Sequence, residues 1–356
     1  MTDNYEDSHE PSTIKGICMS VTSIDQSPNH KIDNSNCNNN NNNHNTQINQ
    51  IALTSSLSSP SSSSPGPRTT DGLDSNNSDY VDSSSTTNPD VTYRVGVAEN
   101  KNSKFRKSME DVHTYVKNFA SRLDWGYFAI FDGHAGIQAS KWCGSHLHTI
   151  VEQKIMEDET RDVRDVLNDS FITIDKQINS DLQGNSGCTA AVCVLRWELP
   201  DNLSKGEVAN LQQYKRRLYT ANVGDSRIVL FRKDGSIRLT YDHKASDILE
   251  MQRVEQAGGL IMKSRVNGML AVTRSLGDKF FDSLVIGNPF TTSVEITDED
   301  HFLILACDGL WDIIEDQDAC ELIKNIKDPN EAAKCLVKYA LEHGTTDNVT
   351  VMVVML

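Results

Sequence analysis

YFAIFDGHAG, residues Tyr127–Gly136, joins an apolar run to a polar turn. The run is apolar at five successive positions, which predicts a strand that is buried on both faces. Asp132 and Gly133 end it, so we expect a carboxylate and an accessible carbonyl group at the rim of a sheet. His134 follows, where a helix is predicted to begin, and its imidazole can change protonation near neutral pH, as a general acid must.

A second stretch, FLILACDGLWD at Phe302–Asp312, has the same design. It is an apolar strand that delivers Asp308 to its end, with Asp312 four residues later. Two acids at this spacing share one face only if the turn is helical, which the following residues permit. Four shorter acidic blocks are Arg106–Asp111 (RKSMED), Gly224–Arg227 (GDSR), Ser275–Asp278 (SLGD) and Asp347–Thr350 (DNVT).

The remaining pattern predicts an α+β fold. Strands are expected at 124–131, 188–195, 217–222, 227–232, 236–241, 293–296, 302–307 and 349–355, and helices at 134–154, 163–180, 246–257, 316–326 and 331–343. Asp234-Gly235 is a hairpin signal, so part of the sheet is antiparallel. Strands without a strict βαβ alternation indicate a four-layer αββα sandwich, in which helices flank two antiparallel β-sheets.

Composition divides the chain of 356 residues in two. Residues 1–90 are rich in Asn, Ser, Thr, Asp and Pro and predict a disordered tail, whereas residues 91–356 predict one catalytic domain. The net charge is −16, and no basic block suited to a phosphate backbone appears, so nucleic acid is not expected as a partner. The polar stretch Glu198–Lys215 predicts a long surface loop.

Eight cysteines without a C-x-x-C pair indicate buried thiols of a reducing compartment. We find neither a signal-peptide pattern nor an apolar stretch long enough to span a membrane. These features predict a monomeric protein of the cytoplasm and also of the nucleus.

The acidic blocks are expected to gather at neighbouring sheet rims. Converging carboxylates raise one another's pKa, and hard divalent cations keep them ionised. Carboxylates and a backbone carbonyl suit Mg²⁺ or Mn²⁺ rather than zinc. Each block also has a purely structural interpretation: Glu110 and Asp111 as a solvated ion cluster with Arg106, Asp132 as a helix cap, and Asp225 and Asp347 as turn residues.

Taken in order, the blocks resemble the metal-dependent Ser/Thr protein phosphatases of type 2C, from about Tyr93 to the C-terminus. Further matching motifs are Ser186–Ala190 (SGCTA), Ala221–Arg227 (ANVGDSR), Asp242–Lys244 (DHK), Arg265–Gly268 (RVNG) and Leu270–Asp278 (LAVTRSLGD). They are most similar to the motifs of fungal members that act on stress-activated MAP kinase pathways. One departure is Ala245, where a proline commonly follows DHK.

The resemblance implies two Mg²⁺ or Mn²⁺ ions with a hydroxide bridging them. It implies that Asp132 binds both ions, that Asp308 and Asp347 complete one site, and that Glu110 with the carbonyl of Gly133 completes the other. The implied substrates are phosphorylated proteins, kinases of a stress-response pathway among them, and the implied outcome is that the pathway is turned down.

By the same resemblance, Asp111 would orient metal-bound water, Arg106 would hold the substrate phosphate, and His134 would protonate the departing serine or threonine oxygen. A third, weaker ion would use Asp225, Asp308 and Asp312, and a flap beside the site would include Arg265 and Asn267. Two other functions stay open from the residues: a metal-dependent hydrolase of small phosphate esters, and an inactive module that binds phosphorylated partners.

Overall fold

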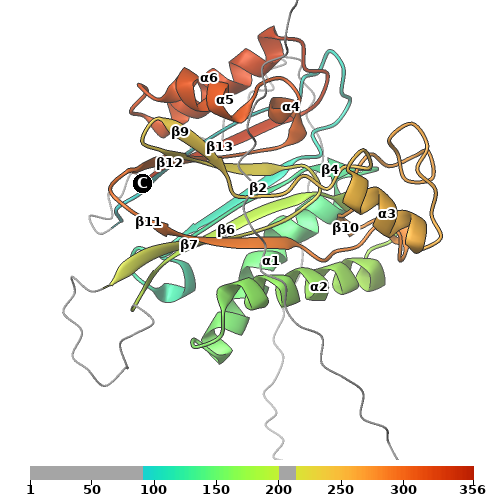
Figure 1. Ribbon diagram of the computed structural model, residues 1–356, viewed down its shortest axis with the longest axis horizontal. Helices are drawn as coiled ribbons and strands as arrows, with labels where there is room; N and C mark the ends of the chain where they lie inside the picture. Colours follow the sequence, from blue (N-terminus) through green and yellow to red (C-terminus); the bar gives the residue numbers. More distant parts are fainter. Residues whose placement is uncertain (1–90, 200–213) are drawn as a thin grey trace, which may run out of the picture. The chain divides into compact units, whose positions relative to one another are not determined.

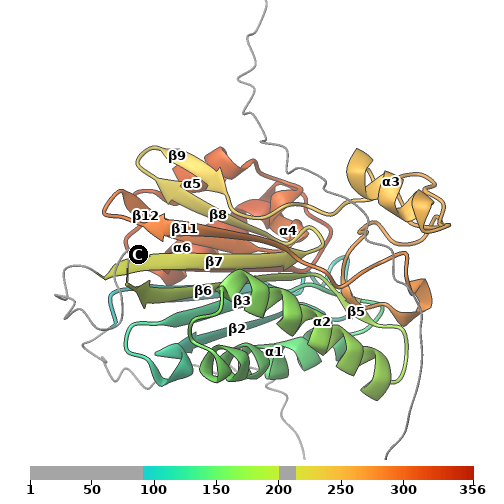
Figure 2. The same ribbon diagram turned by 60° about the horizontal axis from the view of Figure 1, so that its bottom comes forward.

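The computed structural model describes residues 91–199 and 214–356. The predicted tail 1–90, with Cys18 and Cys37, and most of the predicted loop 198–215 lie outside the described residues. Two five-stranded sheets lie face to face, with α5 (Asp316–Ile323) and α6 (Pro329–Glu342) on one outer face. The other outer face is covered by α1 (Gln138–Glu157) and α2 (Val163–Asp181) (Figures 1 and 2). The predicted αββα sandwich is confirmed.

Each pair of neighbouring strands in these sheets is antiparallel. The first sheet has the order β1 (Arg94–Asn100), β13 (Val349–Met355), β12 (Asp300–Ala306), β8 (Arg227–Arg232) and β9 (Gly235–Arg238). The second has the order β11 (Phe290–Ile296), β7 (Lys215–Val223), β6 (Ala190–Glu198), β3 (Gly126–Phe131) and β2 (Val112–Lys117). The turn at Asp234 joins β8 and β9 as an antiparallel hairpin, as predicted.

Smaller elements lie at one end of the sandwich. A three-stranded sheet joins β10 (Leu276–Gly277), β5 (Gly187–Cys188) and β4 (Gly133–His134). The helix α3 (Ile248–Gln256) packs with the following loop around its own small apolar cluster. A one-turn helix, α4 (Asp308–Trp311), follows β12 directly, so Asp308 and Asp312 do share a helical turn. The short 3₁₀ turn Lys279–Phe281 follows β10 at this end, whereas the 3₁₀ turn Phe119–Ser121 lies between β2 and β3 at the opposite end.

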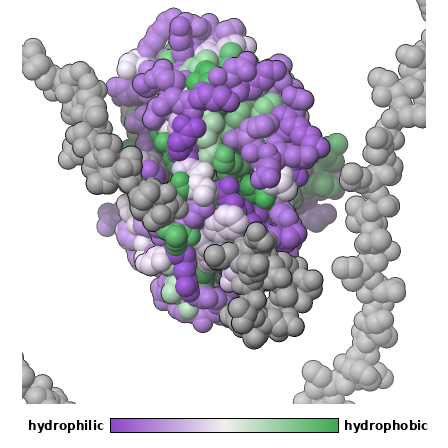
Figure 3. All heavy atoms as spheres, turned by 90° about the vertical axis from the view of Figure 1, so that its left-hand side faces the viewer, coloured by the Kyte–Doolittle hydropathy of each residue, from purple (hydrophilic) through white to green (hydrophobic). Residues whose placement is uncertain are grey.

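The core follows the alternation of side chains along each strand. In β3, Tyr127, Ala129 and Phe131 pack against α1 and α2, whereas Phe128 and Ile130 face the other sheet. The central strands are therefore buried on both faces, as their continuous apolar runs predict. Figure 3 shows the end opposite α3, where hydrophilic residues predominate and smaller hydrophobic areas lie between them.

The sequence patterns misplaced one helix start and missed two strands. His134 does not begin a helix, because Ala135 and Gly136 have positive φ angles of 55° and 121°, and α1 begins at Gln138. The strands β1 and β2 were not predicted, because their alternating polar residues leave both only partly buried. Asp316 and Asn330, residue types that favour helix N-caps, lie inside α5 and α6, whose N-cap positions are Glu315 and Asp328.

Glycines end two of the helices, and the described cysteines are thiols as expected. Gly258 and Gly344 follow α3 and α6 with φ angles of 87° and 92°, the left-handed backbone that ends a helix. The six described cysteines are free thiols, and five of them are buried. Among residues 91–199 and 214–356, no helix combines the length and the apolar composition that a bilayer crossing requires.

Candidate active site

Strands of both sheets deliver acidic and thiol groups to one end of the layer between the sheets. By alternation, Asp132 continues the inward-facing series of Ile130 at the end of β3. Cys307 follows β12 and also faces this layer, while Asp111 directly precedes β2. Ligand atoms of Asp111, Asp132 and Cys307 lie within 4.8 Å of one another. The structure thus gathers residues that are up to 196 positions apart in the chain.

Asp111 has one satisfied oxygen and one unsatisfied oxygen. Its Oδ2 accepts hydrogen bonds from Thr350 Oγ1 at 2.7 Å and from Cys307 Sγ at 3.3 Å. Its Oδ1 is buried and has no hydrogen-bond partner among the described residues. Burial raises the pKa of Asp111 to about 6, and it raises the pKa of the Cys307 thiol well above its usual range. The protonated thiol is therefore a hydrogen-bond donor to Asp111 rather than a thiolate ligand.

Asp132 and Asp308 are the most strongly perturbed acids of the site. Burial first, and then the neighbouring carboxylates, raise the pKa of both groups well above the usual range. Asp308 Oδ1 is buried without a hydrogen-bond partner in the described part of the chain, like Asp111 Oδ1. Such oxygens cost free energy unless a proton or a cation meets them. Hard oxygen donors in this arrangement fit Mg²⁺ or Mn²⁺.

Glu110 and Gly133 lie side by side at the second predicted ion position. A Cβ atom at Gly133 would lie 2.4 Å from the carbonyl oxygen of Glu110, so only glycine lets the two segments approach. Ser140 Oγ donates to the same carbonyl oxygen at 2.6 Å. The Glu110 carboxylate accepts from Ser108 Oγ at 2.7 Å and from the Gly136 amide at 3.1 Å. The side chain is fixed beside the cluster by groups that a cation could replace.

Asp347 and Arg106 pair with each other at the rim of the cluster. The Arg106 guanidinium forms an ion pair with Asp347, and its Nε donates to the Thr346 carbonyl at 3.3 Å. Burial raises the pKa of Asp347. The Arg106 side chain is 49% exposed, so it remains accessible to a ligand from solvent. The structure brings both predicted residues to the site, but the residue expected to hold phosphate is paired here with a predicted metal ligand.

His134 lies in β4, where it contacts an acid that sequence reasoning did not select as a site residue. Its Nε2 lies 2.6 Å from Asp278 Oδ2, and the Asp278 side chain is only 3% exposed. Ser275 Oγ also donates to Asp278 Oδ2, at 2.5 Å. A Cβ atom at Gly187 would lie 2.1 Å from that oxygen, so the opposite strand leaves room for the carboxylate. The only sequence signal for Asp278 was its place in the SLGD block.

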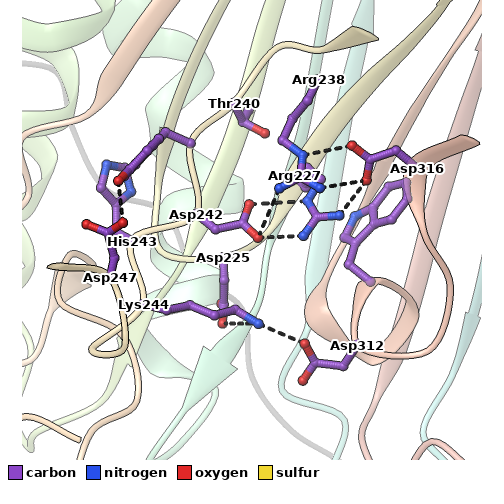
Figure 4. Close-up of polar contacts among 12 residues, drawn as sticks. Asp225, Arg227, Arg238, Thr240, Asp242, His243, Lys244, Asp247, Asp312 and Asp316 are labelled. Carbon is purple, nitrogen blue, oxygen red and sulfur yellow. Dashed lines mark hydrogen bonds and ion pairs between the residues drawn. The ribbon is translucent and has the colours of Figure 1, made fainter. Parts of the chain in front are cut away.

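Two of the acids predicted for a third ion, Asp225 and Asp312, contact a lysine, as Figure 4 shows. Lys244 Nζ lies 2.7 Å from Asp312 Oδ1 and 3.6 Å from Asp225 Oδ2. Burial raises the pKa of Asp225, which lies in the turn after β7. Burial lowers the pKa of Lys244, but Asp225 and Asp312 outweigh it and raise the pKa above its usual value. Lys244 belongs to the DHK motif, to which no role was assigned from the sequence.

The predicted flap residues contact their own loop. Arg265 Nη1 donates to the Met269 carbonyl at 2.7 Å, and Asn267 Oδ1 accepts from the Leu260 amide at 3.0 Å. Asn267 has a φ of 49°, the left-handed conformation that asparagine tolerates better than most residues. These contacts give the loop its shape.

The geometry combines three chemical capacities. Buried carboxylates can hold divalent cations, a guanidinium at the rim can bind a phosphate, and an imidazole on a buried acid can move a proton. This combination suits the hydrolysis of a phosphate ester without a covalent intermediate.

Comparisons with known proteins agree with this chemistry. A family model described as protein phosphatase 2C matches residues 95–349. Over 267 residues the chain is 83% identical to protein phosphatase 2C homolog 1 of Saccharomyces cerevisiae, an alignment that covers 75% of this chain and 95% of the relative. The Schizosaccharomyces pombe protein of the same name is 44% identical over 264 residues, covering 74% of this chain and 73% of the relative. A solved Caenorhabditis elegans sex-determining protein matches with a TM-score of 0.64 and 26% identity, covering 74% of this chain and 64% of that one.

Proposed function

The chain belongs to the protein phosphatase 2C family of serine/threonine phosphatases, and on this premise we propose that two Mg²⁺ or Mn²⁺ ions at the acidic cluster support its removal of phosphate from proteins. When bound, such ions supply water of lowered pKa and neutralise phosphoryl oxygens. The observation that carries the proposal is the pair of buried oxygens, on Asp111 and Asp308, without hydrogen-bond partners among the described residues. A cation would meet Asp308 Oδ1, and water bound to a cation would meet Asp111 Oδ1.

The proposed ligands follow the order of the family motifs. We assign Asp132 to both ions, Asp308 and Asp347 to one ion, and Glu110 with the carbonyl of Gly133 to the other. Support comes from the raised pKa values of Asp132, Asp308 and Asp347, since burial and mutual repulsion leave these acids in need of a positive charge. A third, weaker ion is assigned to Asp225, Asp308 and Asp312.

Three further residues are proposed to handle the substrate. Arg106 binds the phosphate through its accessible guanidinium, once it leaves Asp347. Asp111 orients water through Oδ1, since Oδ2 is engaged by Thr350 and Cys307. His134 donates a proton to the serine or threonine oxygen as it departs, and because Asp278 engages Nε2, its Nδ1 is the nitrogen available for that proton.

For the cellular role, we propose phosphorylated kinases of a stress-response MAP kinase pathway as substrates, and down-regulation of that pathway as the outcome. The support is the resemblance of the motifs to those of fungal members with this role. The free thiols of the six described cysteines support a reducing compartment, and we propose the cytoplasm and the nucleus. We also propose that the enzyme works as a monomer.

The metal dependence is tested by phosphate release from a phosphothreonine peptide. We expect activity with Mn²⁺, its loss on addition of EDTA, and a loss of at least about a hundredfold in Asp132→Ala. Asp298→Ala removes an exposed acid that precedes β12, at the opposite end of this strand from Asp308, and is the matched control, for which full activity is expected. EDTA-insensitive activity would refute the metal mechanism.

The same assay separates the other functions. Faster turnover of sugar or nucleotide phosphates than of the peptide would identify a hydrolase of small esters. An absence of phosphate release from every substrate, with the peptide still bound, would identify an inactive binding module. Substrate trapping with the Asp132 variant would then identify the bound phosphoproteins.

A further inference from the structure

Lys244 lies where the third ion is proposed to bind. Its ammonium group lies 2.7 Å from Asp312 Oδ1 and 3.6 Å from Asp225 Oδ2, and these are two of the three acids assigned to that ion (Figure 4). Positive charge from Lys244 also lowers the pKa of the third acid, Asp308. One ammonium group therefore acts on all three carboxyl groups.

The backbone on both sides of Lys244 is fixed, so this placement is built into the fold. The amide of the preceding residue, His243, donates to the Gly224 carbonyl at 2.9 Å, which ties the lysine to the turn that carries Asp225. The carbonyl of His243 accepts from the Thr273 amide at 2.9 Å, and on the other side the amide of Ala245 donates to the Ala271 carbonyl at 2.7 Å. His243 is 1% exposed, and burial lowers its pKa to about 4, so it stays neutral and packed at neutral pH.

A buried ion network holds the other side of the loop. Asp242 pairs with Arg227, whose side chain is 7% exposed, and Arg227 also pairs with Asp316 of α5. Its guanidinium lies 5.1 Å from the ring of Trp311 in α4, the helix that ends at Asp312. Figure 4 shows this network directly beside Lys244. The lysine and the acid that it contacts are therefore positioned by the same group of side chains.

We propose that Lys244 is a tethered cation that competes with the third divalent ion for Asp225 and Asp312, and so sets how weakly that ion binds. The inference rests on the proposed function, because it takes the third ion from there. A divalent ion can take Asp312 Oδ1 only if the ammonium group leaves that oxygen, and afterwards the ion lies near a positive charge that the fold keeps close. The Lys244 side chain is 32% exposed, so it has a route into solvent when it is displaced.

Lys244 pairs with Asp225 and Asp312, which only the third ion uses. It forms no ion pair with Asp308, which a tighter ion shares, so the proposal assigns the cost to the third ion. Asp132, Glu110 and Asp347 have no contact with Lys244 within the ion-pair distance. Removing the lysine charge should therefore strengthen one class of sites and leave the tighter class unchanged. A lysine that only stabilises the loop would instead alter the folding stability and leave all metal affinities alone.

The test is equilibrium binding of Mn²⁺, with free Mn²⁺ measured by electron paramagnetic resonance, for the full chain and its Lys244→Gln variant. We expect about tenfold tighter binding of the weakest ion in Lys244→Gln, with unchanged binding of the two tighter ions. Lys244→Arg keeps the charge and should bind the weak ion as the unaltered chain does. Lys334→Gln removes a 64% exposed lysine of α6 and should change no class.

Unchanged affinity for the weakest ion in Lys244→Gln would overturn the inference while leaving the proposed function intact. Weak-ion binding that tightens equally in Lys244→Arg would overturn it too, because the charge would not be the cause. If the unaltered chain binds no Mn²⁺ at all, the proposed function itself fails. Thermal unfolding of each variant in EDTA shows whether it is folded, and Lys244→Arg serves as the folded comparison if Lys244→Gln is not.

Discussion

Replacing Asp111 by asparagine should stabilise the metal-free protein while it abolishes activity. Burial raises the pKa of Asp111 from 3.8 to about 6, so ionising this group at neutral pH costs the folded state up to ~3 kcal/mol. Asparagine has the same shape, and its amide oxygen can accept the hydrogen bonds of Thr350 and Cys307. Its NH₂ group would take the place of the unpartnered Oδ1. For a domain of this size, ~3 kcal/mol corresponds to a rise in Tm of roughly 6–12 °C.

The sign of the effect changes with pH in a definite way. Below about pH 4, Asp111 is protonated in both the folded and the unfolded state, so Asp111→Asn should be no more stable than the original protein. Between about pH 4 and 6 the folded state binds more protons than the unfolded state, so the unfolding free energy of the original protein falls as the pH rises. The difference in unfolding free energy between Asp111→Asn and the original protein should therefore grow across this pH range and stay constant above it.

Thermal unfolding in EDTA between pH 4 and 8 measures this difference in stability. Asp300→Asn is the matched control, because Asp300 is also buried but accepts bonds from Arg232 Nε at 2.7 Å and Nη2 at 2.9 Å. That substitution should lower stability by about 1–3 kcal/mol. With Mn²⁺ at a hundredfold excess over its Kd, the original protein should gain ~2.7 kcal/mol per bound ion and Asp111→Asn less. A loss of stability in Asp111→Asn equal to that in Asp300→Asn would show that repulsion does not govern the cluster.

Three other substitutions test the proton donor and the helical turn that follows β12. His134→Ala and Asp278→Asn should each slow hydrolysis of a phosphothreonine peptide by at least about tenfold. Hydrolysis of p-nitrophenyl phosphate should slow much less, because only an alkoxide needs a proton as it leaves. Equal slowing of both reactions in steady-state kinetics would count against His134 as the acid. Gly309→Ala would place a Cβ atom 2.0 Å from the Asn348 carbonyl oxygen, so the backbone must move. We expect the unfolding free energy, measured by denaturant unfolding, to fall by about 1–3 kcal/mol. An unchanged denaturant midpoint would contradict this close approach.

The sequence was most informative where apolar runs end. The buried strands β3, β12 and β13 have nearly continuous apolar sequences, and such runs can be recognised without knowing their neighbours. The acids that follow two of them, Asp132 and Asp308, were predicted to converge because strand ends share a rim. The strands β1 and β2 escaped prediction because neither has a continuous apolar run, and polar, partly exposed side chains interrupt the pattern in both.

Contacts between distant segments could not be predicted from sequence patterns. Asp278 lies 144 positions after His134, and no periodicity links the two. The same holds for Arg227 and Asp316, which are 89 positions apart. The start of α1 was misplaced for a local reason. Ala135 has a positive φ, which interrupts the chain before the helix, and alanine is not a residue type that indicates such a conformation. Local patterns thus located the acids, and tertiary packing selected their partners.

The acidic cluster draws its side chains from both halves of the sandwich, with Asp132 supplied by one sheet and Asp308 by the other. A shift of one residue between the sheets would displace these groups by ~3.3 Å, more than the length of a metal–oxygen bond. Catalysis therefore depends on the relative position of the two sheets. The hydrophobic contacts between the sheets must hold that position before phosphate can be cleaved, and neither sheet alone carries a complete active site.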